Sequence, residues 1–508
     1  MYDLFILGLK MENKASLVGT NMTRGGPGDK TKPGEYTTED WFQNVSDHTK
    51  SDLEKDDTIT AKTKNKDIWF CSIPFNQVYS EINGNYQACC FGKDSGIPIE
   101  SMSLVDWMEK SDYMNNIRKE MLDPNSDFKH VEDTCNRCRD DERKYGRSRR
   151  TNCMKIHTND QHHWDGIERS ARMFERTGEY WIGERILEIQ LKIFGSECNL
   201  DCHMCFHSNS SMRWDMARKK EVWNKELWGP FDQARIDKID DVFKNRASKD
   251  MLEQVCDLAP SIRSIKIIGG EPLIMKRQYE LLDMLIKSGD SKDIFLKFQT
   301  NFTKLQAGKH KFVDYIPHFG NIAMVASVDG IGDSIEYMRR RTDWKELEDN
   351  IDICTKFPNV VVDFNGLVSF LSVLRFDEVI KYCKDNDKIH QINWAMIDKP
   401  KHLRVNNLPF AIKNSLIDRY EGYPDIQSAL RIPPENDVDI QDVFEYLLKQ
   451  DEGYKGTKWE MNLFDVFPEL RPYYYPRERT PEMEAMFKRW EADEKAASKD
   501  RENDEKGL

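Results

Sequence analysis

Cys198, Cys202 and Cys205 lie within eight residues of one another with the spacing C-x3-C-x2-C, and no fourth cysteine follows nearby. A structural zinc site closes its tetrahedron with four protein ligands, so three thiolates alone leave such a site incomplete. Three thiolates suit a [4Fe–4S] cluster, because each binds one iron and the fourth iron stays open to another ligand. The spacing therefore predicts an iron–sulfur cluster with one open coordination position.

Polar motifs also stand at the carboxyl ends of three other predicted strands. They are Gly269-Gly270-Glu271-Pro272 after the run 262–268, Gln299-Thr300-Asn301 at the end of 294–300, and Ser327-Val328-Asp329-Gly330 at the end of 322–328. The cysteines themselves follow an alternating run, 186–193, that is typical of a strand. In parallel α/β folds, the loops after the strands converge on one face, where active sites are built. The four motifs therefore predict one shared site.

The elements that would position these residues alternate between strands and helices from residue 184 onward. Six strand-like runs are separated by helical patterns, which predicts an α/β fold with a parallel sheet or partial barrel over 184–409. The two remaining strand-like runs are 360–364 and 389–394, and the helical patterns are 210–228, 275–288, 344–355 and 376–385.

The regions on either side of this barrel have different compositions. Residues 1–66 are polar with almost no apolar periodicity, which predicts a disordered leader. Residues 67–151 are a compact cysteine-rich segment, and 152–183 are a polar and aromatic bridge, with His162-His163-Trp164 interpreted as a loop. Residues 410–508 are predicted to be helical, over 439–450 and 481–496, and to end in a charged tail.

The segment 67–151 contains five cysteines: Cys71, Cys89, Cys90, Cys135 and Cys138. Residues 71–90 have the pattern of a hairpin with an Asn-Gly turn at 83–84, and the last two cysteines form a C-x2-C pair. Four thiolates can close either a zinc site or an iron–sulfur cluster. The four cysteines alone therefore do not decide between a zinc site and an iron–sulfur cluster. The isolated Cys256, Cys354 and Cys383 fall on helical patterns and are interpreted as inert buried residues.

The composition limits the class of protein. The formal net charge of −13 argues against a protein that coats nucleic acid generally. No run approaches the roughly 18 apolar residues that suggest a membrane span, and no secretory signal is evident at the N-terminus. The 12 cysteines cluster in short motifs, which favours metal binding in a reducing cytoplasm over a disulfide scaffold.

The combination of C-x3-C-x2-C, G-G-E-P and S-x-D-G resembles the radical SAM superfamily over about residues 184–409. The resemblance implies a partial (β/α)6 barrel in which Cys198, Cys202 and Cys205 hold a [4Fe–4S] cluster. S-adenosylmethionine (SAM) would chelate the open iron through its amino and carboxylate groups. Reduction of the cluster would split SAM into methionine and a 5′-deoxyadenosyl radical, which abstracts a substrate hydrogen. One departure is Met204, where many members carry an aromatic residue.

The resemblance also implies roles in SAM binding for the loops after the strands. The two glycines would let the backbone approach SAM closely, and Glu271 would pair with the methionine ammonium group. Arg339 is the candidate for the SAM carboxylate, and no residue is assigned as hydrogen donor or general base. The SAM-binding positions are Gly269, Gly270, Glu271, Pro272, Asn301, Ser327, Asp329 and Arg339.

The cysteine-rich segment resembles the twitch or SPASM-type auxiliary-cluster module of radical SAM enzymes that modify peptides and proteins, although here it precedes the barrel. The resemblance implies an auxiliary cluster on Cys71, Cys90, Cys135 and Cys138, with Cys89 as the alternative to Cys90 and zinc as the alternative metal. It also implies a peptide or protein substrate and an electron donor such as flavodoxin or ferredoxin. The alternatives are a radical SAM enzyme acting on RNA or a small metabolite, and a non-catalytic, zinc-stabilised binding protein on a degenerate barrel.

Overall fold

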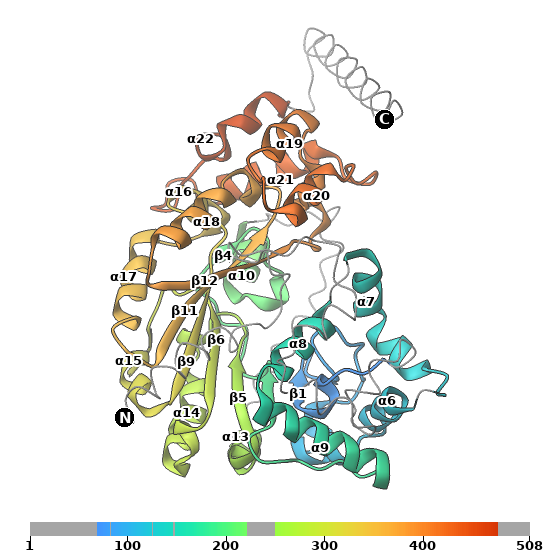
Figure 1. Ribbon diagram of the computed structural model, residues 1–508. Coiled ribbons are helices and arrows are strands. Elements are labelled where there is room, and N and C mark those ends of the chain that lie inside the picture. Colours follow the sequence, from blue (N-terminus) through green and yellow to red (C-terminus); the bar gives the residue numbers. More distant parts are fainter. Residues whose placement is uncertain (1–68, 82, 124, 146–147, 221–248, 476–508) are drawn as a thin grey trace. The chain divides into compact units, whose positions relative to one another are not determined.

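The computed structural model describes residues 69–475 except 82, 124, 146–147 and 221–248 (Figure 1). The predicted leader, the predicted helix 481–496, the charged tail and the end of the predicted helix 210–228 lie outside the described residues. The chain divides into two compact units. The first lies within 1–217, 232–367 and 378–395, and the second within 218–231, 368–377 and 396–508.

The first unit is built on an eight-stranded sheet with the order β12-β11-β9-β6-β5-β3-β1-β2 (Figure 1). Neighbours from β11 to β1 pair in parallel, and β2 is antiparallel to β1. All six strand-like runs form strands, which confirms the predicted α/β class with a mostly parallel sheet. The strands are β1 (Gln77–Ser80), β2 (Tyr86–Gln87), β3 (Leu187–Leu191), β5 (Ile262–Ile267), β6 (Phe295–Thr300), β9 (Asn321–Ser327), β11 (Val360–Val368) and β12 (Ile389–Met396).

The cysteine-rich segment is part of this same sheet. The predicted hairpin is present as β1 and β2, with Tyr79 opposite Gln87. The sequence did not indicate that β1 would also pair in parallel with β3, where Val78 lies beside Ile189. The cysteine-rich segment is therefore joined to the strand that precedes the cysteine triplet.

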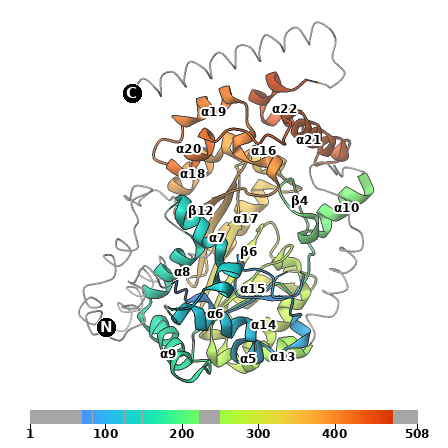
Figure 2. The same ribbon diagram turned by 90° about the vertical axis from the view of Figure 1, so that its right-hand side faces the viewer.

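Helices α5 to α9 gather beside β1 and β2 (Figure 2). His162-His163-Trp164 in the bridge 152–183 was interpreted as a loop, but these residues lie in the first turn of α9. Asp160 caps that helix by accepting a hydrogen bond from His163 N, and Gly178 ends it in the left-handed conformation. The helices are α5 (Leu104–Lys110), α6 (Asp112–Leu122), α7 (Lys129–Tyr145), α8 (Arg149–Thr158) and α9 (Gln161–Thr177).

The helices that follow the later strands agree with the predicted patterns. Helices α14, α17 and α18 fall on the patterns 275–288, 344–355 and 376–385, and α10 begins where 210–228 begins. These helices are α10 (Ser211–Lys220), α13 (Lys249–Asp257), α14 (Lys276–Ser288), α15 (Phe312–Tyr315), α16 (Asp333–Met338), α17 (Trp344–Cys354) and α18 (Phe376–Asp385).

The second unit is mainly helical, as predicted. Its helices are α19 (Phe410–Ile417), α20 (Pro424–Arg431), α21 (Ile440–Tyr454) and α22 (Leu463–Val466). Within the ranges that the structure describes, no helix has both the length and the hydropathy to cross a membrane.

The two faces of the large sheet differ in polarity. Side chains alternate between faces along a strand, and partners in a parallel register share a face. One face is apolar, with Ile189, Ile265 and Leu296 among its buried residues. The opposite face is also buried and carries polar side chains beside an apolar cluster of Phe295, Ala323 and Val325. Its polar residues include Glu188, Gln190, Ser264, Lys266, Lys297 and Asp363.

Candidate metal centre and cofactor site

The cysteine triplet lies on a loop between β3 and α10 that is fixed by a short strand pair. Strand β4 (Asp201–Cys202) pairs antiparallel with β10 (Arg339–Arg340), which places Arg339 directly opposite Cys202. The backbone N–H of His203 donates to the carbonyl of Met338 at 3.0 Å. The loop is therefore attached to the segment that follows the fourth core strand, rather than being free at the sheet edge.

Burial keeps the triplet thiols protonated in the absence of metal. It raises the pKa of Cys198 to about 12 and that of Cys202 to about 11, and it also raises the pKa of Cys205. Cys202 raises the pKa values of Cys198 and Cys205 further, because two neighbouring thiolates repel. A bound metal cation reverses this preference and holds such thiols as thiolates. The donor set therefore fits an iron–sulfur cluster.

The loop after β5 packs directly on the cysteine loop at Gly270. A Cβ at this position would lie 2.1 Å from the carbonyl oxygen of Glu197 and 2.4 Å from that of Ser196. The next N–H, that of Glu271, donates to the Glu197 carbonyl at 2.7 Å. Gly270 is thus required for the contact between two loops of the protein, a role that its sequence motif did not reveal.

Glu271 is fully buried and ties the end of β5 to the end of β6. Its carboxylate accepts hydrogen bonds from Thr300 Oγ1 at 2.6 Å and from the backbone N–H groups of Asn301 at 2.6 Å and Leu273 at 3.0 Å. Burial outweighs these three donors and raises the pKa of Glu271 to about 7. A carboxylate has about four acceptor positions, so one remains for a further donor. The pairing with a methionine ammonium stays a prediction.

Asn301 brings an amide next to the cysteine triplet. Its Nδ2 donates to Asn199 Oδ1 at 2.9 Å and lies 4.0 Å from the sulfur of Cys198. Its Oδ1 accepts from the backbone N–H of Thr303 at 3.0 Å. The end of β6 is therefore in contact with the first cysteine, as the convergence of the motifs predicted.

Arg339 and Asp329 form a buried ion pair beside Cys202. The Nε of Arg339 donates to Asp329 Oδ2 at 2.7 Å, and its Nη1 lies 3.8 Å from the sulfur of Cys202. Burial would lower the pKa of Arg339, but Asp329 and Cys202 more than offset it and hold that pKa above its usual range. Asp329 therefore positions Arg339. Ser327, two residues earlier, accepts a hydrogen bond at Oγ from Gln299 Nε2 at 3.2 Å.

A second buried ion pair supports the loop and was missed from the sequence. Arg213 Nη1 donates to Asp201 Oδ1 at 2.9 Å, and both side chains are almost completely buried. Asp201 lies between two cysteines of the motif, and Arg213 lies on α10. The position of Asp201 inside the cysteine motif could have suggested a buried ion pair, but the identity of its partner, Arg213, depends on the tertiary fold.

The N-terminal cysteines surround a cavity of their own. Two of them, Cys135 and Cys138, are three residues apart on α7 and so share a helix face. Among the described residues, the cavity lining includes Cys89 but not Cys90, so the structure groups the alternative residue with the other three cysteines. The lining residues are Trp69, Cys71, Ile73, Cys89, Phe91, Thr134, Cys135, Cys138, Arg149 and Arg150.

These thiols are also protonated in the absence of metal. Burial raises the pKa of Cys135 to about 12, and it raises the pKa values of Cys71 and Cys89 well above their usual range. Repulsion between neighbouring thiolates adds to the effect, since Cys135 lies close enough to raise the pKa of both other thiols. The four thiols therefore form one electrostatically linked group.

Comparison with known proteins concerns the part of the first unit that follows the cysteine-rich segment. Residues 183–330 match the family model described as a 4Fe-4S single cluster domain. The matched range includes the cysteine triplet, the G-G-E-P loop, Asn301 and the S-x-D-G loop. No curated protein sequence matches the chain.

Two solved structures share limited similarity with the chain. One is Streptococcus suis SuiB bound to S-adenosylmethionine, with 15% identity and a TM-score of 0.29, over 52% of this chain and 51% of SuiB. The other is TYW1 with a lysine-pyruvate adduct bound, with 14% identity and a TM-score of 0.24, over 44% of this chain and 70% of TYW1. The chain thus spans about half the length of SuiB. Residues 183–330 are therefore similar to a 4Fe-4S single cluster domain, and they contribute parallel strands to the α/β sheet of the first unit.

Proposed function

We propose that this chain is a radical SAM enzyme that modifies a peptide or protein. The observation that carries the proposal is that polar side chains from two separate segments, the end of β6 and β10, meet at the cysteine triplet. Asn301 Nδ2 lies 4.0 Å from the sulfur of Cys198, and Arg339 Nη1 lies 3.8 Å from that of Cys202. Hydrogen-bond donors of this kind, next to a three-thiolate cluster site, suit a chelating amino-acid ligand such as the methionyl part of SAM.

The chain's own residues would bind and orient the cofactors. Cys198, Cys202 and Cys205 would hold three irons of the cluster, and Asp329 would keep Arg339 directed at the carboxylate of SAM. When bound, the cluster would pass one electron from an external donor to SAM, and this chemistry would supply methionine and a 5′-deoxyadenosyl radical for hydrogen abstraction. The protein contributes position and exclusion of water, and the difficult chemistry belongs to the cofactor.

The N-terminal cavity supports the auxiliary-cluster part of the proposal. Four thiols can close a cluster, and Cys71, Cys89, Cys135 and Cys138 all line this cavity. Two guanidinium groups, those of Arg149 and Arg150, line it as well and would offset the negative charge of four thiolates. We assign Cys89 in place of Cys90 on this basis. A closed cluster beside the barrel suits electron transfer or the shaping of a pocket for a peptide.

Anaerobic reconstitution with iron and sulfide, followed by dithionite and SAM, tests the proposal. We expect 5′-deoxyadenosine from the wild type and none from Cys198→Ala. The matched control is Cys354→Ala, which removes a fully buried thiol from α17, away from both cysteine groups. A purified protein that contains zinc, takes up no iron and never yields 5′-deoxyadenosine would establish the zinc-stabilised binding protein instead.

A further inference from the structure

The buried polar face of the sheet carries two lysines next to each other. Lys266 on β5 and Lys297 on β6 are partners in the parallel register, so their side chains leave the same face. They are only 7% and 6% exposed. Lysines are almost never fully buried unless they are paired with an acceptor. Each of these two residues therefore calls for a partner.

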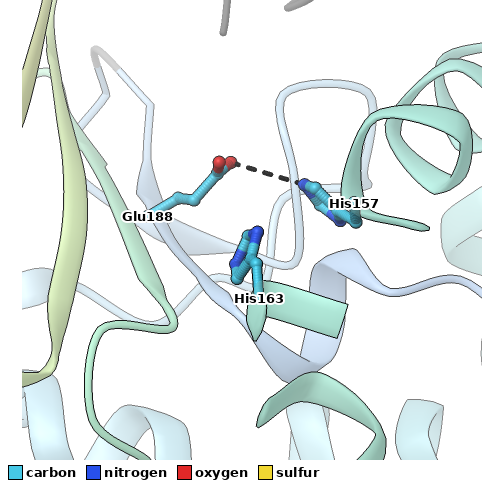
Figure 3. Close-up of side chains that lie close together, drawn as sticks. All are labelled: His157, His163 and Glu188. Carbon is cyan, nitrogen blue, oxygen red and sulfur yellow. Dashed lines mark ion pairs between the residues drawn. The ribbon is translucent and has the colours of Figure 1, made fainter. Parts of the chain in front are cut away.

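The nearest acidic side chain, Glu188, is already shared. Its Oε1 lies 3.9 Å from Lys297 Nζ, and its Oε2 lies 3.8 Å from His157 Nε2, as the dashed line in Figure 3 shows. In the register of the sheet, Ser264 on β5 is the partner of Glu188, and the next β5 residue on the same face, Lys266, is the partner of Lys297. One carboxylate thus serves a lysine and a histidine.

Lys266 has no such acceptor. Among the residues that the structure describes, none forms a hydrogen bond or an ion pair with its Nζ. Most of the groups that act on it electrostatically are cations from three other elements. Burial and these cations lower the pKa of Lys266 to about 7, and only Cys90 opposes them. The charged groups that act on Lys266 are Arg149 on α8, Lys297 on β6, Lys192 after β3 and Cys90 after β2.

The neighbouring group His157, His163 and Glu188 could be taken for a metal site, since its ligand atoms lie within 4.8 Å of one another (Figure 3). Both histidines already have hydrogen-bond partners. His157 Nδ1 pairs with Ser72 Oγ at 2.7 Å, and His163 Nε2 pairs with the carbonyl of Ile186 at 3.0 Å. A divalent cation would add two positive charges beside Lys297. The cations that surround Lys266 therefore favour an anion over a further cation beside it.

We propose that Lys266 binds an oxyanion of the substrate, a carboxylate or a phosphate group, on the inner face of the sheet. The inference rests on the proposed function and adds the chemistry by which the substrate is recognised. Lys266 stands three residues before Gly269, which is about 10 Å along a strand at about 3.3 Å per residue. An oxyanion held there would place the rest of the substrate toward the loops that carry the cysteine triplet and the G-G-E-P motif.

The test uses the full-length, cluster-reconstituted protein without SAM or reductant, with inorganic phosphate and acetate as probes and chloride to balance ionic strength. Trace acetylation near pH 7, followed by mass spectrometry, reports the reactivity of Lys266. We expect the probe anion to slow acetylation of Lys266. Protection by phosphate alone would indicate a phosphorylated substrate, and protection by acetate would indicate a carboxylate.

Two variants add a direct measurement of anion affinity by calorimetry. We expect Lys266→Met to weaken binding of the protecting anion by about tenfold or more, because hydrogen bonds to charged groups are the strong ones. Lys192→Met is the matched control. It removes a nearby ammonium that already pairs with Glu81, and we expect a change of about threefold or less.

Three outcomes would overturn the inference. The first is acetylation of Lys266 that neither anion slows. The second is protection by cluster assembly alone with no further effect of the anions, which would show that the lysine serves the auxiliary cluster. The third is equal loss of affinity in both variants. Formation of 5′-deoxyadenosine is measured separately, so a protein that cleaves SAM but fails these tests loses only this inference.

Discussion

The two cysteine groups of the first unit differ in the elements that hold their thiols and in the side chains that lie beside them. In the group after β3, three thiols come from one loop, and the polar side chains of Asn301, after β6, and Arg339, on β10, reach them. In the N-terminal segment, two thiols from α7 and two from the segments around β1 and β2 line one cavity together with aromatic rings and two arginines. Three thiols with donors beside them suit an exchangeable ligand, whereas four thiols suit a closed site.

The contacts that hold the two cysteine groups in place also differ. The barrel loop is held by a strand pair and by the buried ion pair of Arg213 with Asp201. The N-terminal group depends on α7 and on Arg150, which pairs with Glu142 at 2.5 Å and lies over the ring of Trp69. Its ion pair is more exposed than the one in the barrel. The barrel site is therefore the more rigidly built of the two.

The strongest test of this comparison removes one group at a time. We expect Cys198→Ala/Cys202→Ala/Cys205→Ala to abolish formation of 5′-deoxyadenosine while leaving about four irons per chain, which belong to a second [4Fe–4S] cluster. Iron analysis and product detection on reconstituted protein are the measurements. Loss of all iron in this triple variant would confine the clusters to the barrel and end the comparison.

The next test separates two neighbouring cysteines. We expect Cys89→Ala to lose about four irons per chain, because it removes a ligand from the closed site. Cys90→Ala is the matched control and should keep them, since Cys90 does not line the cavity among the described residues. Iron loss in the Cys90 variant with retention in the Cys89 variant would restore the assignment made from the sequence.

Much of this arrangement could be predicted from the sequence, because it depends on local patterns. Alternating or continuous apolar runs gave the six core strands, and the motifs at their ends converge because parallel strands end at one edge. The hairpin at 77–87 was predictable from its Asn-Gly turn. In contrast, β1 has only four residues, and its pairing with β3 depends on contacts between segments more than 100 residues apart.

The parts that could not be predicted depend on tertiary contacts. Position 270 requires a glycine because the cysteine loop lies against it. Asp329 orients Arg339, which comes ten residues later in the chain. Cys89 and Cys90 are adjacent in the chain, so spacing cannot tell which of them faces the cavity. Helix α9 was missed because its buried face, with Trp164, is interrupted by polar residues.

A third test compares the supports of the two cysteine groups. Breaking a buried ion pair leaves an uncompensated charge and costs about 3–5 kcal/mol, so we expect Arg213→Met to lower the free energy of unfolding by that amount. Arg150→Met breaks the more exposed pair of the N-terminal group and should cost clearly less. Chemical denaturation of cluster-loaded protein gives both values. Equal losses would contradict the claim that the barrel loop is the more rigidly held.

The smallest expected effect concerns Glu271 and the pH dependence of stability. Its pKa is raised from 4.5 to about 7 on folding, so the folded state binds the extra proton between these values. Stability should therefore fall as pH rises from about 4.5 to 7, by about 1–3 kcal/mol. Glu271→Gln cannot titrate, so it should lack this part of the slope. Unfolding free energies measured across this window for both proteins provide the check.

The same experiment with SAM present decides whether Glu271 is a ligand or only a support. An ammonium group beside the carboxylate favours its charged form and lowers its pKa. If Glu271 pairs with the methionine ammonium of SAM, the difference in slope between wild type and Glu271→Gln should shrink when SAM is bound. Binding of SAM raises the unfolding free energy of both proteins, but the difference between their slopes against pH can still be measured. A difference that SAM does not change would limit Glu271 to holding Thr300 and Asn301 in place.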